Sequence, residues 1–219
     1  MRVAIVGAGG IGCIYGASLA KAGAEVVFLA RGAHLAALRA NGLRIEGGRG
    51  ETHIDPVQAT DDPASVGIVD YAIFCVKLWD VESAGAAIKP LVGRETAVIP
   101  QQNGVDAHER LIPILGREAV MGGTAWVTGS IVAPGVVRQT GAYQRLIFGE
   151  LDGTRDSVDG HAGDGEPDYS GRHGQLLFRH NGHPYAAGHR LGDCRCRWRV
   201  PGDDYDDGVA GRHDECRRE

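Results

Sequence analysis

The stretch Arg2-Val-Ala-Ile-Val-Gly7-Ala-Gly9-Gly-Ile-Gly12 decides the fold of this chain. It opens with a nearly continuous apolar and β-branched run, which is typical of a parallel strand buried on both faces. Residues 13–22 follow with apolar positions at helical spacing, and residues 25–30 form a second apolar run. A strand, a helix and a strand in this order predict one βαβ unit at the start of the chain.

The glycines at the first strand–helix turn follow the Gly-x-Gly-x-x-Gly pattern. Gly7 permits the tight turn out of the strand, Gly9 lets a pyrophosphate approach the backbone, and Gly12 allows close packing of helix on strand. The helix N-terminus adds N–H donors and the positive end of the helix dipole. Because the pattern lies between a predicted strand and a predicted helix, it predicts a dinucleotide site. The candidate cofactor-binding residues there are Gly7, Ala8, Gly9, Gly10, Ile11 and Gly12.

Strand and helix patterns continue to alternate up to about residue 150. Helices are predicted at 33–40, 80–88 and 105–115, buried strands at 70–77 and 96–100, polar edge strands at 43–46 and 52–57, and later strands at 123–132, 136–139 and 146–149. The turn Ala133-Pro-Gly135 separates the two strands of a hairpin. These elements predict an α/β fold, namely a doubly wound parallel (Rossmann-type) sheet with a terminal strand hairpin.

The composition of the chain changes near residue 155. The chain has 219 residues and a formal net charge of -5, yet its last Lys is Lys89 and its last Ile is Ile147. A segment poor in aliphatic residues cannot bury enough apolar surface to offset the entropy of ordering its backbone. We therefore predict a folded cofactor domain over residues 1–153 and a largely unstructured, low-hydrophobicity tail over 154–219. A shifted reading frame of GC-rich DNA is a second hypothesis for the tail, which is rich in Arg, Gly, Asp and His.

Three polar residues follow the predicted core strands. Arg31 follows the second strand, where NAD sites carry an acid and NADP sites tend to carry Arg, so NADP(H) is the predicted cofactor. Lys77 ends a later buried strand and Asn103 lies just past the next one, at the carboxyl edge where open α/β sheets bind ligands. We predict that both contact the cofactor and lie next to the substrate. The residues alone leave open that Arg31 and Lys77 are solvated surface side chains and that Asn103 belongs to a simple turn.

Composition also excludes several classes of protein. No stretch approaches the roughly 18 apolar residues that span a bilayer, and the mild acidity argues against nucleic-acid binding. Five Cys in 219 residues is ordinary intracellular usage, so we expect a cytoplasmic protein without a disulfide framework. Cys13 and Cys75 are expected to pack as small apolar residues. The tail cysteines, Cys194, Cys196 and Cys216, lack metal-ligand spacing, so no metal site is predicted.

Seven short motifs occur in a characteristic order over residues 1–155. They are Gly7-Ala-Gly-Gly-Ile-Gly12, Leu29-Ala-Arg31, Cys75-Val-Lys77, Gln102-Asn-Gly-Val105, Gly122-Gly-Thr124, Pro134-Gly-Val-Val137 and Phe148-Gly-Glu-Leu-Asp-Gly153. Together they resemble the ketopantoate reductase (2-dehydropantoate 2-reductase) family. The resemblance implies NADPH-dependent reduction of a small 2-oxo acid, 2-dehydropantoate to pantoate in pantothenate biosynthesis. It also implies that the glycine loop holds the pyrophosphate, Arg31 the 2′-phosphate, and Lys77 and Asn103 the nicotinamide and substrate.

The chain departs from the family pattern after residue 155. The resemblance implies a proton-donating lysine in a C-terminal helical domain, but no lysine follows Lys89 and no helical apolar pattern appears. We assign no catalytic residue, and we expect this chain to lack that domain, to bind NADP(H) and to reduce 2-dehydropantoate negligibly. Two hypotheses remain beside this one: a non-catalytic NADP-binding module, and another 2-oxo or 2-hydroxy acid dehydrogenase with the same cofactor domain. The sequence leaves the oligomeric state open.

Overall fold

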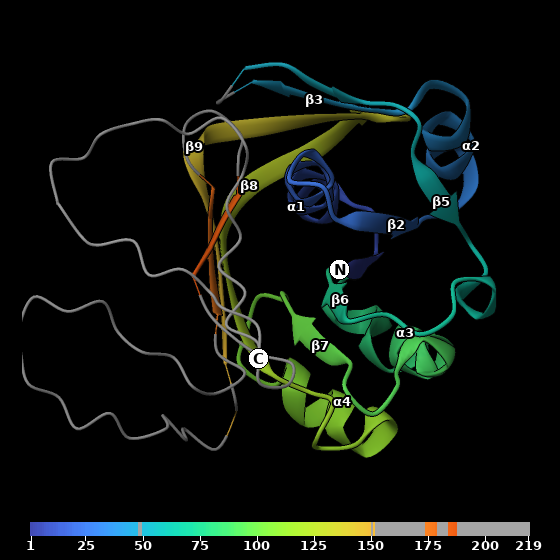
Figure 1. Ribbon diagram of the computed structural model, residues 1–219, viewed down its shortest axis with the longest axis vertical. Helices are drawn as coiled ribbons and strands as arrows, with labels where there is room; N and C mark the ends of the chain where they lie inside the picture. The colour runs from blue at the N-terminus through green and yellow to red at the C-terminus, as the bar shows by residue number, and fades with distance from the viewer. Residues whose placement is uncertain (48–49, 150, 152–173, 179–183, 188–219) are drawn as a thin grey trace, which may run out of the picture.

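The computed structural model describes residues 1–47, 50–149, 151, 174–178 and 184–187 (Figure 1). Its first layer is a five-stranded sheet in the order β5-β2-β1-β6-β7, and every neighbouring pair in it is parallel. The strands are β1 (Arg2–Val6), β2 (Glu25–Leu29), β5 (Gln58–Thr60), β6 (Tyr71–Phe74) and β7 (Ala97–Pro100). The first strand lies at the centre, between β2 and β6, as in a Rossmann-type sheet.

Helices cover both faces of this sheet, so the predicted doubly wound α/β fold is confirmed. The helices are α1 (Gly10–Lys21), α2 (Gly32–Asn41), α3 (Val81–Ala87) and α4 (Ala107–Leu115). Because side chains alternate along a strand, Val3 and Ile5 pack with α1 and α2, whereas Ala4 and Val6 pack with α3 and α4. The near-continuous apolar run at the start of the chain therefore contributes side chains to two separate hydrophobic cores.

A second sheet lies beyond α1 and encloses that helix between the two sheets (Figure 1). It has the strand order β11-β10-β9-β3-β4, with β8 paired to β9. Its strands are β3 (Leu43–Gly47), β4 (Thr52–Ile54), β8 (Gly122–Ala133), β9 (Val136–Gly149), β10 (Gly174–Phe178) and β11 (Pro184–Ala187). The predicted terminal hairpin is confirmed as β8–β9, and β9 also pairs in parallel with β3, about 90 residues earlier.

Two short strands, β10 and β11, lie within the predicted tail. Strand β10 pairs antiparallel with β9 and with β11, which extends the second sheet. The other residues after 151 lie outside the described part of the chain. The domain boundary at 153 and the shifted reading frame therefore stay predictions.

Several predicted element boundaries were wrong, each because a distant partner ends or extends the element. The strand predicted at 70–77 ends at Phe74, where the next strand along the sheet also ends. Of the run predicted at 52–57, only Thr52–Ile54 is a strand, β4, which pairs with β3. The next strand, β5, begins at Gln58 and pairs with β2 in the other sheet. The strands predicted at 136–139 and 146–149 are one strand, β9, whose two ends both pair with β8, on either side of a register shift between Trp126 and Thr128.

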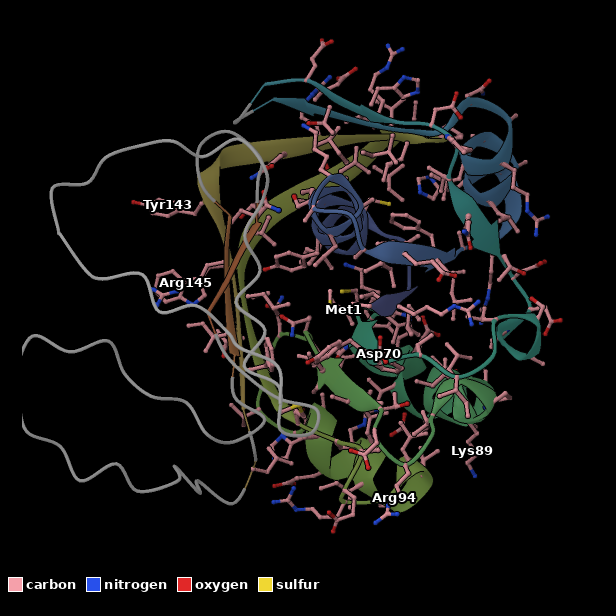
Figure 2. The ribbon with its side chains drawn as sticks, in the orientation of Figure 1. Met1, Asp70, Lys89, Arg94, Tyr143 and Arg145 are labelled. Atoms are coloured by element: carbon pink, nitrogen blue, oxygen red, sulfur yellow. The ribbon has the colours of Figure 1, made fainter. Side chains whose placement is uncertain are left out.

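The outer face of the second sheet carries aromatic and charged side chains. Tyr143 is 79% exposed and Trp126 is 53% exposed. Figure 2 shows that Tyr143 and Arg145 point away from α1. On the inner side, the Tyr15 hydroxyl of α1 donates a hydrogen bond to the Arg145 carbonyl at 2.9 Å. Helix α1 is therefore tied to both sheets, which fixes the position of its N-terminus.

Candidate functional site

The glycine loop between β1 and α1 has the geometry that the sequence predicts for two of its glycines. Gly7 has φ +91°, and a Cβ added there would lie 2.9 Å from the Val76 nitrogen. A Cβ added at Gly12 would clash with the Gly7 carbonyl oxygen and lie 2.8 Å from Cγ2 of Ile5. Both positions therefore need glycine, the first for the turn and the second for the contact between helix and strand.

Gly9 differs from these two glycines because the space beside it is open. Its φ of -81° is ordinary, and a Cβ added there would meet no other described atom within 4 Å. No side chain caps the N-terminus of α1 at Gly9. The first N–H groups of an α-helix lack partners inside the helix. Open space in front of an uncapped helix N-terminus fits the pyrophosphate of a dinucleotide, as the glycine pattern predicts.

Gly10 packs against the second sheet, a contact that the sequence pattern did not predict. A Cβ added at Gly10 would clash with the carbonyl oxygen of Gly129 in β8. Gly129 in turn faces Ile14, because its own added Cβ would clash with the Cδ1 atom of that side chain. An isolated glycine inside a strand pattern often marks a close approach of two backbones, so Gly129 carried a signal that could have been read.

Arg31 lies beside the glycine loop. The Ala8 N–H donates to the Leu29 carbonyl at 3.0 Å, which joins the loop to the end of β2. Arg31 follows two residues later as the N-cap residue of α2, and its side chain is exposed. Among the described residues its guanidinium has no ion-pair partner. The structure therefore places a free cation next to the predicted pyrophosphate site.

Lys77 and Asn103 are exposed residues in the loops that follow β6 and β7. These loops are joined by Gln102, whose Nε2 donates to the carbonyls of Phe74 at 3.0 Å and Val76 at 2.9 Å. The glycine loop rests on the same backbone, since Gly7 packs against Val76. The structure therefore brings the predicted residues to one edge of the parallel sheet, where the strands end. No pattern in the sequence predicted a role for Gln102.

A chain of hydrogen bonds runs from the β8–β9 turn to the glycine loop through two buried or half-buried side chains. The Gly135 N–H donates to Nδ1 of His34 at 3.1 Å, so the other ring nitrogen carries the proton. That nitrogen, Nε2, lies 3.5 Å from Sγ of Cys13, and the Cys13 thiol donates to the Ala8 carbonyl at 3.4 Å. Burial raises the pKa of Cys13 to about 12 and lowers the pKa of His34. Cys13 packs in the core as predicted, and Cys75 is half-buried against the same cluster.

This geometry predicts a loss of stability at mildly acidic pH. Because the pKa of His34 is lower in the folded chain than in the unfolded one, unfolding takes up a proton once the pH falls below about 6.5. The contribution of neutral His34 to the free energy of unfolding is thus fully present above that pH, and it declines as the pH falls toward the pKa of His34 in the folded chain. We expect the melting temperature of wild-type chain to fall more between pH 7.5 and 5.5 than that of His34→Gln. Equal falls in the two proteins would contradict the assignment.

In the part of the chain that the structure describes, no group of three His, Cys, Asp or Glu side chains could hold a metal ion. No helix there is both long and apolar enough to cross a membrane. The tail cysteines, Cys194, Cys196 and Cys216, lie outside the described residues, so their status stays a prediction.

Comparison with known protein families finds a match over most of the chain. A family model described as ketopantoate reductase PanE/ApbA matches residues 3–153. This chain belongs to the ketopantoate reductase family. The resemblance seen in the sequence motifs is thereby confirmed, over the part of the chain that contains the glycine loop, Arg31, Lys77 and Asn103.

Relatives of this ketopantoate reductase family member are similar over the same part. The 2-dehydropantoate 2-reductase of Mesorhizobium japonicum is 33% identical over 177 residues, which cover 71% of this chain and 53% of the relative. The uncharacterized oxidoreductase YkpB of Bacillus subtilis is 30% identical over 155 residues, which cover 71% of this chain and 50% of the relative. The structure of a PanE/ApbA family ketopantoate reductase from Ralstonia eutropha has a TM-score of 0.61 at 40% identity, covering 64% of this chain and 47% of that one. The match thus spans about half the length of these relatives.

Proposed function

We propose that this chain binds NADP(H) and forms the cofactor-binding half of a reductase that acts on a small 2-oxo acid. The observation that carries the proposal is the open space beside Gly9, in front of the uncapped N-terminus of α1. Arg31 flanks this space at the end of β2, and Lys77 and Asn103 lie beyond the ends of β6 and β7. Family membership supports 2-dehydropantoate as the substrate and pantothenate biosynthesis as the setting.

Each residue of the site has a proposed role that follows from its chemistry. The N–H groups at the start of α1 donate to the pyrophosphate, and the Arg31 guanidinium pairs with the 2′-phosphate. The Lys77 ammonium and the Asn103 amide can donate to the carboxylate and carbonyl oxygens of a 2-oxo acid. Bound NADPH supplies the hydride for reduction of such a carbonyl. The proton for the resulting alkoxide is proposed to come from a group outside the described residues, and no residue here is assigned that role.

The proposal is tested by replacing Arg31 with alanine in the full 219-residue chain. Charge-assisted hydrogen bonds to phosphate contribute about 1.5–3 kcal/mol, so we expect NADPH affinity to fall about 10- to 100-fold. NADH lacks the 2′-phosphate, and its affinity should stay within about twofold. Titration followed by fluorescence of the reduced nicotinamide measures both constants.

The matched control is Arg39→Ala, which removes one positive charge from the same helix. The Arg39 side chain donates to the Ala59 carbonyl at 2.9 Å, toward β5 and away from the glycine loop. This variant should bind NADPH like wild type. An equal loss of NADPH affinity in both variants would mean that only the net charge matters. Wild-type chain that binds neither nucleotide would overturn the proposed function itself.

A further inference from the structure

Gln102 extends the connection between β6 and β7 beyond the point where their backbone pairing stops. The last backbone bond of that ladder runs from the Gln101 N–H to the Phe74 carbonyl at 2.9 Å. The Gln102 amide then donates to the same Phe74 carbonyl and to the Val76 carbonyl. One side chain thus holds both ends of the segment Phe74–Cys75–Val76, directly before Lys77.

The orientation of the Gln102 amide is determined by these two contacts. Both neighbours are carbonyl oxygens, which accept hydrogen bonds, so the NH2 group must face them and Oε1 must point elsewhere. Among the described residues, Oε1 of Gln102 is buried without a hydrogen-bond partner. The same holds for Nε2 and Oε1 of Gln101, which is 7% exposed.

Buried polar atoms without partners are uncommon in folded proteins, because leaving them unpaired costs free energy. Three such atoms lie on two consecutive residues here, at the carboxyl end of β7. Packing alone would favour apolar side chains at these positions. This cluster of unpaired amide atoms therefore indicates that the two residues serve binding and not the stability of the fold.

We propose that Gln102 is a positioning residue for the nicotinamide end of the NADP(H) site, and this inference rests on the proposed function. Gln102 sets the distance between the loop that carries Lys77 and the loop that carries Asn103. Both loops lie past the ends of neighbouring parallel strands, which is where this fold binds ligands. Arg31 and the open space beside Gly9 depend on this connection less directly. The Ala8 N–H donates to the Leu29 carbonyl at the end of β2, and the glycine loop meets the segment that Gln102 holds only where Gly7 packs against Val76.

The inference is tested with Gln102→Met in the full chain, since methionine has a similar length and no N–H donor. Two ligands separate the two halves of the site: NADPH, and 2′,5′-ADP, which carries the 2′-phosphate but no nicotinamide. We expect Gln102→Met to weaken NADPH binding about tenfold or more while 2′,5′-ADP affinity stays within about twofold. The fluorescence of bound NADPH should also shift toward that of the free nucleotide. If the role of Gln102 were purely structural, Gln102→Met would weaken the binding of both ligands alike.

Two more variants complete the design. Gln102→Asn keeps the amide but is one methylene shorter, so it can reach only one of the two carbonyls, and we expect an intermediate loss for NADPH alone. Gln58→Met makes the same change at an exposed position of β5 and should leave both affinities unaltered. Equal losses for both ligands, or no loss for NADPH in either Gln102 variant, would overturn the inference. Wild-type chain that binds 2′,5′-ADP but not NADPH would overturn it too, and leave the phosphate site of the proposed function intact.

Discussion

Replacing Gly12 with alanine is expected to lower the melting temperature of the chain by about 3–10 °C. Two effects oppose each other here. Alanine is favoured over glycine inside a helix by about 1 kcal/mol, which would stabilise α1. The added methyl group, however, clashes with the Gly7 carbonyl oxygen and lies 2.8 Å from Cγ2 of Ile5.

The clash wins because a backbone carbonyl cannot rotate away as a flexible side chain can. Overpacking of a well-packed core costs about 1–3 kcal/mol or more, and a domain of this size loses about 2–4 °C per kcal/mol. Gly9→Ala is the matched control, since a Cβ at Gly9 meets no other described atom within 4 Å and should change stability by less than about 0.5 kcal/mol. Thermal unfolding followed by circular dichroism compares the two. A melting temperature for Gly12→Ala at or above that of Gly9→Ala would contradict the packing argument.

Replacing Gly9 with aspartate is expected to abolish NADPH binding without destabilising the chain. Aspartate is a preferred N-cap residue, so the start of α1 should be as stable as before or more stable. Its carboxylate, however, would occupy the space proposed for the pyrophosphate. Two unit charges 4 Å apart repel each other by about 4 kcal/mol at an effective dielectric constant of 20. We therefore expect a loss of at least about 100-fold in NADPH affinity.

Two control variants test whether the loss of NADPH affinity comes from the position of the new charge, from the added charge itself or from the added side-chain volume. Gln58→Glu adds one negative charge on an exposed position of β5 and should bind NADPH like wild type. Gly9→Ala adds a methyl group without charge and should lose less affinity than Gly9→Asp. Calorimetric titration gives the affinities, and thermal unfolding of the same samples confirms that each variant is folded. Wild-type affinity in Gly9→Asp would place the dinucleotide somewhere other than the glycine loop.

Much of the candidate site could be predicted because its signals are local. The tight turn at Gly7 and the helix contact at Gly12 are set by residues close in sequence, and the structure has both. Lys77 and Asn103 could be placed on one edge because the carboxyl ends of parallel strands meet there. To place Asn103 at that edge, it is enough to know that the strand before it is parallel to its neighbour, and the alternation of strands and helices predicts this.

Other parts of the site escaped prediction because they depend on contacts between distant segments. Gly10 meets Gly129 of β8, about 120 residues later, and nothing in either local sequence specifies that pairing. His34 likewise reaches Gly135 of the hairpin turn across 101 residues. Gln102 belongs to a motif of the sequence, but its two carbonyl acceptors lie at the end of β6 and in the loop that follows it.

The sequence by itself determined the βαβ unit, the parallel doubly wound sheet and the chemistry of the exposed residues along its carboxyl edge. These follow from periodicity, glycine placement and the charge of single residues, which are properties of short segments. Only the tertiary structure decided that the consecutive strands β4 and β5 lie in different sheets, that β3 pairs with β9, and that the second sheet closes over α1. The physical reason is that strand pairing and helix–sheet packing join segments far apart in the chain, and the residues of one segment carry little information about its partner.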